Sequence, residues 1–245
     1  MNDKHLSKRL LRVANYVPKG ATIADIGSDH AYLPCYLCLQ DQTRRAIAGE
    51  LNEGPYQSAR NQVRRSKLNG RIDVRKGNGL AVITKDDRVE VVTIAGMGGG
   101  LIASILEEGK KELAGVQRLV LQPNVAAIHI REWLYTNDWR LIDEDILCED
   151  GKIYEIVVAE RGIDHALYEH GRERKLLLGP YLSERRGPTF LQKWSMEAAN
   201  WHRVLRQIGQ AAPSDELSEK KQELNERIKM VEEVLSWEKK STDKH

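Results

Sequence analysis

The chain has 245 residues and a formal net charge of +2, and this length allows one sizeable α/β core plus a smaller second part. It contains no apolar run of the roughly 20 residues that a membrane span needs, and its first residues lack a signal-peptide core, so we expect a cytoplasmic protein with no membrane partner. Its three cysteines fit a reducing compartment rather than a disulfide scaffold.

Apolar residues with helical spacing open the chain, and the helix that they predict ends at Pro18-Lys19-Gly20. Strands and helices then alternate as far as Trp139. The predicted segments are strand 22–27, helix 31–40, strand 46–51, helix 55–68, strand 72–76, strand 89–95, helix 99–114, strand 117–122 and helix 125–137. Alternation of this kind predicts a parallel sheet with helices on both faces.

The first strand ends in an acid-bearing loop, Asp25-Ile26-Gly27-Ser28-Asp29-His30, directly before a helix. A strand that ends in this way is typical of sites that hold a nucleotide-like cofactor at the carboxyl edge of a parallel sheet. Glycine lets the backbone approach the ligand, and the helix N-terminus offers N–H groups that have no partner within the helix. Alone, the loop also fits a tight turn in any α/β fold.

Each later strand also ends in residues suited to a ligand. Glu50 closes the second strand about 20 residues after the loop, where nucleotide-binding sheets place a carboxylate for the ribose hydroxyls. The third, fourth and fifth strands run into Asn78-Gly79-Leu80, Ala95-Gly96-Met97-Gly98 and Gln122-Pro123-Asn124. Because the carboxyl ends of parallel strands share one edge of the sheet, we expect a single site there.

Cys35 and Cys38 have the C-x-x-C spacing of redox and metal sites. The chain offers no second pair, and no nearby histidine completes a zinc set. We therefore predict that both lie buried on a helix and that the protein has no metal site.

The alternation stops after Trp139, where two strand-like runs, 140–149 and 152–160, meet at the hairpin signal Asp150-Gly151. A parallel sheet that ends in an antiparallel hairpin is the layout of class I S-adenosylmethionine-dependent methyltransferases. An NAD-dependent oxidoreductase is the alternative. It would continue with another strand and helix, and it would carry a G-x-G-x-x-G turn, whose later glycines are missing from residues 27–32.

The last part of the chain has a helical pattern. Apolar residues recur in steps of three and four over residues 191–208 and 217–235, and Gly209 to Ser214 separate the two segments. Two such helices joined by a short turn predict an antiparallel coiled-coil hairpin. Their tryptophans fit the interface between the helices better than a platform for stacked bases.

These patterns predict two domains. Residues 1–165 would form a Rossmann-like methyltransferase domain, and residues 166–245 would form an all-α coiled-coil domain.

Basic residues are unevenly distributed along the chain. Residues 1–76 hold 14 Lys and Arg against 7 Asp and Glu, a net charge of +7, whereas residues 77–160 hold 8 against 15, a net charge of −7. Residues 172–206 carry 8 against 3, a net charge of +5. This bias favours a surface that faces nucleic acid, although solvated helix faces would give the same counts.

Three segments carry a family resemblance: Ala24-Asp25-Ile26-Gly27-Ser28-Asp29-His30-Ala31-Tyr32-Leu33-Pro34, Ile94-Ala95-Gly96-Met97-Gly98-Gly99 and Leu121-Gln122-Pro123-Asn124. The chain resembles the TrmK family, the bacterial tRNA (adenine(22)-N(1))-methyltransferases. The D-H-A-Y-L-P and G-M-G-G runs are specific, since generic methyltransferases seldom carry both. The resemblance covers the whole chain, including its first helix and its C-terminal helices.

The resemblance implies methylation of N1 of adenine 22 in tRNA, with S-adenosyl-L-methionine as cofactor and tRNA as partner. We expect a monomer. A non-catalytic RNA-binding protein with a methyltransferase-like core is the other alternative, and the intact Asp25, Gly27 and Glu50 argue against it.

The resemblance also implies roles for the residues at the sheet edge. Those that would hold the cofactor are Asp25, Gly27, Ser28, His30, Glu50, Leu51, Asn78, Gly79, Leu80, Ala95, Gly96 and Met97. Those that would contact the target base are Gly98, Gln122, Pro123 and Asn124.

Adenine N1 has an in-plane lone pair, so its methylation needs alignment more than a strong general base. The product ring is cationic, and a nearby carboxylate would stabilise the developing charge. Asp29 is the candidate catalytic residue, with capping of the helix that starts near Ala31 as its alternative role. His30 could contact the cofactor or the target, or could be a structural histidine.

Overall fold

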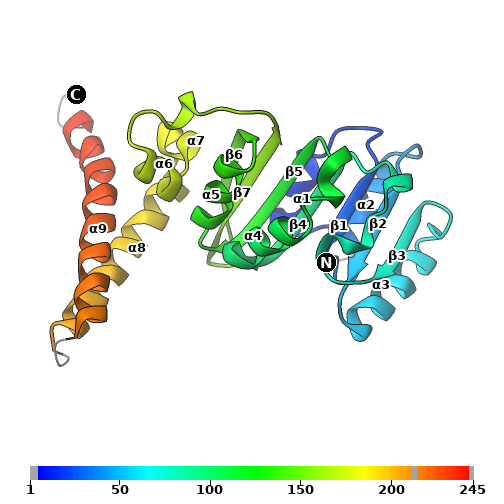
Figure 1. Cartoon of the computed structure of the whole chain (residues 1–245), viewed down its shortest axis with the longest axis horizontal. Helices are drawn as coiled ribbons and strands as arrows, with labels where there is room; N and C mark the ends of the chain where they lie inside the picture. The colour runs from blue at the N-terminus through cyan, green and yellow to red at the C-terminus, as the bar shows by residue number, and fades with distance from the viewer. Residues whose placement is uncertain (1–4, 211–213, 243–245) are drawn as a thin grey trace. The chain divides into compact units, whose positions relative to one another are not determined.

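The computed structural model describes residues 5–210 and 214–242, with residues 237–242 described by their backbone only. The chain divides into two compact units, Met1–His165 and Ala166–His245 (Figure 1).

The first unit contains a seven-stranded sheet with the strand order β3-β2-β1-β4-β5-β7-β6. The first five strands of the chain run parallel, and β7 runs antiparallel to both β5 and β6. The strands are β1 (Ile23–Ile26), β2 (Ala46–Glu50), β3 (Ile72–Lys76), β4 (Val91–Gly98), β5 (Arg118–Val125), β6 (Trp139–Glu149) and β7 (Lys152–Arg161). The helices are α1 (Lys8–Asn15), α2 (Tyr32–Gln40), α3 (Glu53–Arg65), α4 (Gly99–Glu108) and α5 (Ile128–Thr136). The predicted class I methyltransferase fold, with its terminal hairpin, is confirmed.

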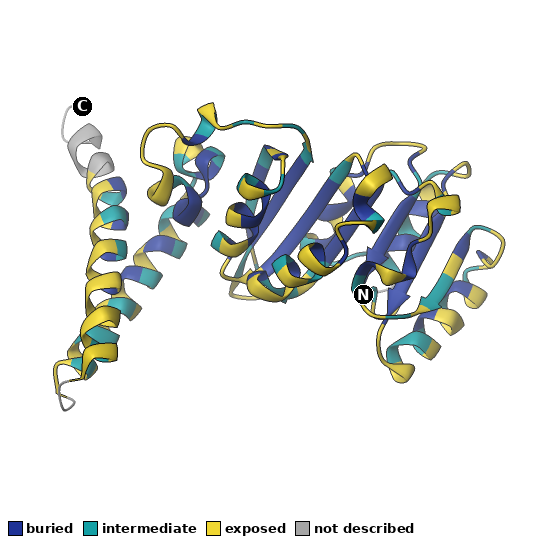
Figure 2. Ribbon diagram, viewed as in Figure 1, coloured by how far each residue is buried: buried dark blue, intermediate teal, exposed yellow. Residues whose placement is uncertain are grey.

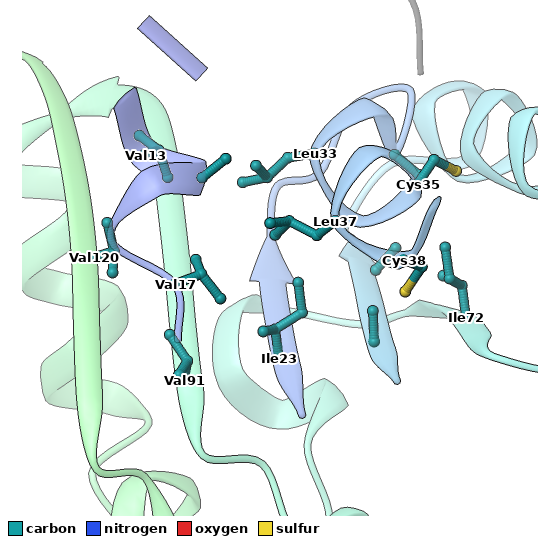
Figure 3. Close-up of a cluster of buried hydrophobic side chains, with 14 of the residues drawn as sticks. Val13, Val17, Ile23, Leu33, Cys35, Leu37, Cys38, Ile72, Val91 and Val120 are labelled. Atoms are coloured by element: carbon teal, nitrogen blue, oxygen red, sulfur yellow. The ribbon is translucent and has the colours of Figure 1, made fainter. Parts of the chain in front are cut away.

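Strands β1, β2 and β5 are buried along most of their length and β4 along its first half (Figure 2), as expected of parallel strands covered on both faces. On one face, α1 and α2 contribute Val13, Leu33 and Leu37 to a cluster over Ile23 (Figure 3). Cys35 and Cys38 lie within the same cluster, and neither is exposed.

The burial of Cys38 raises the pKa of its thiol to about 11, so the thiol stays protonated at neutral pH. Both cysteines are therefore core residues of α2, as predicted. Among the side chains of residues 5–210 and 214–236, no group of three or more His, Cys, Asp and Glu could hold a metal ion.

Two strands extend three residues beyond their predicted ends. β4 ends at Gly98 rather than at residue 95, and β5 ends at Val125 rather than at residue 122. Their pairing continues through a register irregularity at Ala95 to Gly98, where Gly96 has φ +81°. The glycine-rich segment therefore belongs to paired strand ends rather than to a free loop.

Two helices are shorter than predicted by four or more residues. α4 ends at Glu108 rather than at residue 114, and Gly109, which follows it, lies so close to Leu80 that a Cβ atom there would overlap the leucine side chain. α5 begins at Ile128 rather than at residue 125, because β5 occupies the preceding residues.

The second unit consists of α6 (Arg172–Leu178), α7 (Pro180–Arg185), α8 (Pro188–Ile208) and α9 (Asp215–Thr242). The two long helices α8 and α9 pack side by side (Figure 1). Their contact buries apolar side chains that recur at steps of three and four: Phe190, Trp194, Ala198, Leu224, Ile228, Val231 and Val234. Trp194 is only 4% exposed and is thus a core residue, as predicted.

The sequence pattern did not predict the short helices α6 and α7. Each has at most seven residues, which is too short for a helical period to show. Gly179, at φ +87°, separates them, and Pro180 starts α7.

Candidate active site

Asp25 is the buried carboxylate at the end of β1. Its Oδ2 accepts a hydrogen bond of 2.6 Å from the Ser28 hydroxyl, and its Oδ1 accepts one of 2.6 Å from the Thr93 hydroxyl on β4. Burial raises its pKa, and the two hydroxyl donors partly offset the rise. Asp25 thus ties the β1 loop to β4, the neighbouring strand.

The loop after β1 turns tightly because three of its residues have left-handed backbone angles. Gly27 has φ +68°, Asp29 has φ +57° and Ala31 has φ +52°. The N–H groups of Gly27 and Ser28 both donate to the Gly49 carbonyl, at 2.9 and 3.2 Å. The loop is therefore held against the end of β2, where Glu50 lies.

Glu50 is the second buried carboxylate of the site, with 6% of its surface exposed. Its Oε1 accepts a hydrogen bond from the Asp29 N–H. Burial raises the pKa of Glu50 to about 7; the Asp29 N–H opposes this rise, and the charges of Asp25 and Asp29 add to it. A carboxylate in this setting gains from a ligand that donates hydrogen bonds to it.

Asp29 directs its side chain outward, and 70% of that side chain is exposed. Helix α2 begins at Tyr32, its N-cap residue is Ala31, and no side chain caps it. The alternative role of Asp29 as a helix cap is therefore wrong. Its carboxylate is accessible beside the buried pair Asp25 and Glu50.

His30 is also accessible, with 47% of its side chain exposed. Its Nε2 lies 3.7 Å from Asp29 Oδ1, and its ring stacks on Tyr32 with 5.2 Å between the ring centroids. A buried structural role for this histidine is thus excluded.

Four of the residues predicted to hold the cofactor follow the ends of β2 and β3. Leu51 is 58% exposed directly after Glu50, and Asn78 is exposed after β3. Gly79 and Leu80 belong to a short 3₁₀ helix, Gly79–Val82, and the Leu80 side chain is 1% exposed because it packs under Gly109. Only the backbone of Leu80 is left for a ligand.

The end of β4 meets the loop after β1. The Met97 methyl group lies so close to Gly27 that a Cβ atom at residue 27 would overlap it. Ala95, Met97 and Gly98 are half-buried, and Gly96 is exposed. The structure thus brings the candidate cofactor loop and the glycine-rich strand end together.

Gln122 and Asn124 on β5 fix Gly96 from both sides. The Gln122 Oε1 accepts from the Gly96 N–H at 3.0 Å, and the Asn124 Nδ2 donates to the Gly96 carbonyl at 2.7 Å. Gln122 is fully buried, and its Nε2 donates to the Pro123 carbonyl at 2.8 Å. Gln122 therefore supports the strand end rather than reaching a ligand. Of the other two residues of β5 predicted to contact the target base, Pro123 is buried and Asn124 is exposed.

Arg9 is a residue of this edge that the sequence reasoning missed. Its Nη1 donates to the Gln122 Oε1, and it lies 3.5 Å from the position that a Cβ atom would take on Gly96. No local pattern marks it, because Lys8-Arg9 at the start of an amphipathic helix resembles an ordinary pair of solvated basic residues. Only the packing of α1 against the sheet brings it to the site.

Comparisons with known proteins assign the chain to a family. The sequence model of TrmK, described as tRNA (adenine(22)-N(1))-methyltransferase, matches residues 23–233. The chain belongs to the TrmK family. It is 50% identical over 236 residues to the tRNA (adenine(22)-N(1))-methyltransferase of Bacillus subtilis (strain 168). This match covers 96% of this chain and 99% of that protein.

Solved structures of TrmK relatives match both units. The crystal structure of the B. subtilis M1A22 tRNA methyltransferase TrmK superposes with a TM-score of 0.89 and covers 95% of this chain and 99% of that one. The Streptococcus pneumoniae protein Sp1610, solved in complex with S-adenosyl-L-methionine, is 44% identical with a TM-score of 0.83 and covers 94% of this chain and 100% of its own. The resemblance found in the sequence motifs is thereby confirmed. No helix of the part described here is long and apolar enough to cross a membrane.

Proposed function

We propose that this TrmK-family chain transfers a methyl group from S-adenosylmethionine to N1 of adenine 22 in tRNA. The observation that carries the proposal is the match to the B. subtilis enzyme over nearly the full length of both chains. The site agrees with it, because the acidic loop, Glu50 and the glycine-rich strand end meet at one edge of the sheet.

The residues at the end of β1 and β2 fit the proposed cofactor. Glu50 would accept hydrogen bonds from the two ribose hydroxyls, and the exposed Leu51 would lie beside the adenine, with Asn78 and the backbone of Gly79 and Leu80 along its rim. Gly27 allows close approach of the loop backbone, on which Ser28 and His30 would face the methionine part. Asp25 would act indirectly, by holding Ser28 and β4 in place through its hydrogen bonds.

Bound S-adenosylmethionine would supply an electrophilic methyl group on a positively charged sulfonium. Ala95 to Gly98 would separate this group from the target base and align N1 with it. The backbone of Gly96 is fixed by Gln122 and Asn124, and the segment has no side-chain carbonyl that could grip the exocyclic amine. This suits attack by a ring nitrogen.

Asp29 would stabilise the positive charge that develops on the methylated ring, which is why we propose it as the catalytic residue. The exposure of its carboxylate supports this role, since a base extruded from tRNA could reach it. N1 lies on the Watson–Crick edge, so the adenine must be unpaired before it enters the site.

We infer that residues 166–245 act as a separate domain that helps to hold tRNA. The net charge of +5 over residues 172–206 supports this role. A tRNA substrate favours a cytoplasmic location. We further propose that the protein is a monomer.

The test is a methylation assay with a tRNA transcript that carries adenine at position 22 and with a matched transcript that carries guanine there. The proposal expects S-adenosylmethionine-dependent 1-methyladenine in the first transcript and none in the second. Calorimetric titration with S-adenosylmethionine and with NAD accompanies the assay. Binding of NAD alone would support the oxidoreductase, and RNA binding without methyl transfer would support a non-catalytic module.

A further inference from the structure

The guanidinium of Arg9 lies at the β4–β5 side of the site. It donates to the buried amide of Gln122, whose same oxygen also holds the Gly96 N–H. Glu50, which would bind the cofactor ribose, lies at the end of β2. The strand order places β1 and β4 between β2 and β5. Arg9 therefore lies on the side of the glycine-rich strand end that would face the target nucleotide.

The position of Arg9 is fixed by its surroundings. The backbone N–H groups of Lys8 and Arg9 donate to the Glu149 carboxylate at 2.6 and 3.1 Å, which anchors the first turn of α1 to β6. The Arg9 guanidinium carbon lies 5.3 Å from the centroid of the Tyr154 ring on β7. The Arg9 side chain, held by Gln122 and Tyr154 on an anchored helix turn, loses little further entropy when it binds a ligand.

The guanidinium of Arg9 has no acidic partner among the side chains that the structure describes. Within residues 5–210 and 214–236, no carboxylate lies within 4 Å of its guanidinium nitrogens, and its one side-chain acceptor is the neutral amide of Gln122. Arg12, one turn later on the same helix, differs in this respect, because its Nη1 lies 2.7 Å from Asp145 Oδ2. A half-buried guanidinium with several unused N–H donors is suited to bind an anion.

We propose that Arg9 binds a phosphate of the target nucleotide and thereby positions the adenine over Ala95 to Gly98. This inference rests on the proposed function, since it takes the anion from the tRNA that is methylated. A phosphate fits because a planar guanidinium matches it with two parallel hydrogen bonds. The base edge does not fit, because the methylated ring becomes cationic and a guanidinium would repel it.

The test compares Arg9→Gln with Arg12→Gln in the full-length enzyme. The two variants lose the same charge from the same helix, but only Arg9 lacks a carboxylate partner. Binding of tRNA is measured at several salt concentrations in the presence of S-adenosylhomocysteine, so that no turnover occurs, and kcat and KM are measured with S-adenosylmethionine.

Arg9→Gln should weaken tRNA binding roughly ten- to a hundredfold, the range for a lost hydrogen bond to a charged group. It should also reduce the slope of log K against log salt by about 0.7 to 0.9, the value for one released phosphate contact. Arg9→Lys should restore the slope because it keeps the charge. Arg12→Gln should leave the slope unchanged, because Asp145 already neutralises Arg12.

Gln122→Ala separates phosphate binding from support of the strand end. It removes the amide that Arg9 contacts but keeps the charge of Arg9. If Arg9 only supported the strand end, Arg9→Gln and Gln122→Ala would both lower kcat and leave the salt slope unchanged. That result would overturn the proposal. So would a loss of S-adenosylmethionine affinity in Arg9→Gln as large as the loss in Glu50→Gln, because it would assign the anion to the cofactor carboxylate. Wild-type enzyme that binds tRNA without methylating adenine 22 would instead refute the proposed function.

Discussion

Glu50 gives a prediction in which stability and binding change in opposite directions. Its pKa of about 7 in the fold compares with an ordinary value of 4.5. The pKa of Glu50 is higher in the folded chain than in the unfolded chain. Its contribution to the free energy of unfolding is therefore complete below pH 4.5 and is lost as the pH rises through about 7. Each pKa unit corresponds to about 1.4 kcal/mol, so an ionised Glu50 costs the ligand-free protein up to about 3 kcal/mol at pH 8.

Glu50→Gln removes this cost and keeps an oxygen for the Asp29 N–H. Differential scanning calorimetry of the ligand-free full-length chain should therefore show a higher Tm for the variant at pH 8, by roughly 5–10 °C, and nearly equal Tm values at pH 5. Equal Tm values at both pH values would refute the assignment of the raised pKa to burial of the carboxylate.

The same substitution should weaken S-adenosylmethionine binding. An amide can accept from one ribose hydroxyl but not from both, so the loss should exceed about 1 kcal/mol, or roughly fivefold in Kd. Wild-type affinity should also fall as the pH drops below 7, because protonated Glu50 is a poorer acceptor, whereas the affinity of Glu50→Gln should stay constant. Calorimetric titration measures both effects, and unchanged affinity in a folded variant would remove Glu50 from the site.

Three further substitutions or deletions test other parts of the molecule. Asp29→Ala should lower the single-turnover rate of methyl transfer far more than it changes cofactor affinity or Tm, and a lower Tm with an unchanged rate would argue against a catalytic role. Arg131→Met should lower the free energy of unfolding, measured in urea, by about 3–5 kcal/mol. The Glu144 and Glu155 carboxylates lie 2.6 and 2.7 Å from Arg131, and the substitution leaves them buried without their cation. A free energy of unfolding within about 1 kcal/mol of wild type would contradict this reasoning. A chain that ends at residue 165 should bind S-adenosylmethionine as the full chain does but should lose most tRNA affinity and its steep salt dependence, and equal tRNA isotherms for both chains would assign residues 166–245 another purpose.

The sheet could be predicted from the sequence because its determinants are local. Alternating apolar segments and the Asp150-Gly151 turn specify strands, helices and a hairpin without knowledge of tertiary contacts. The strand ends were less predictable. Glycine-rich residues such as Gly96 predict a loop, but here the backbone of Gly96 is bonded to Gln122 and Asn124, so pairing between β4 and β5 continues.

The site divides in the same way. Some site residues occur at fixed positions relative to strand ends and can therefore be predicted from the sequence, as are Asp25, Gly27 and Glu50. Arg9 precedes the sheet in the chain, and its place depends on how α1 docks on Glu149 and Tyr154, more than a hundred residues away. Such a contact has no local signature. Leu80 illustrates the reverse case, since a leucine predicted to hold the cofactor has its side chain buried in the core.

The charges along the sheet edge suggest why the two ligands do not compete. Asp25, Asp29 and Glu50 make the β1–β2 side acidic, whereas Arg9 makes the β4–β5 side basic. S-adenosylmethionine carries a cationic sulfonium, so the acidic side would attract it, and a phosphodiester backbone would be repelled there and attracted to Arg9. Methyl transfer neutralises the sulfonium and leaves the positive charge on the adenine. The acidic side therefore holds S-adenosylhomocysteine less strongly than S-adenosylmethionine, so the same charges that attract the cofactor before the transfer favour its release afterwards.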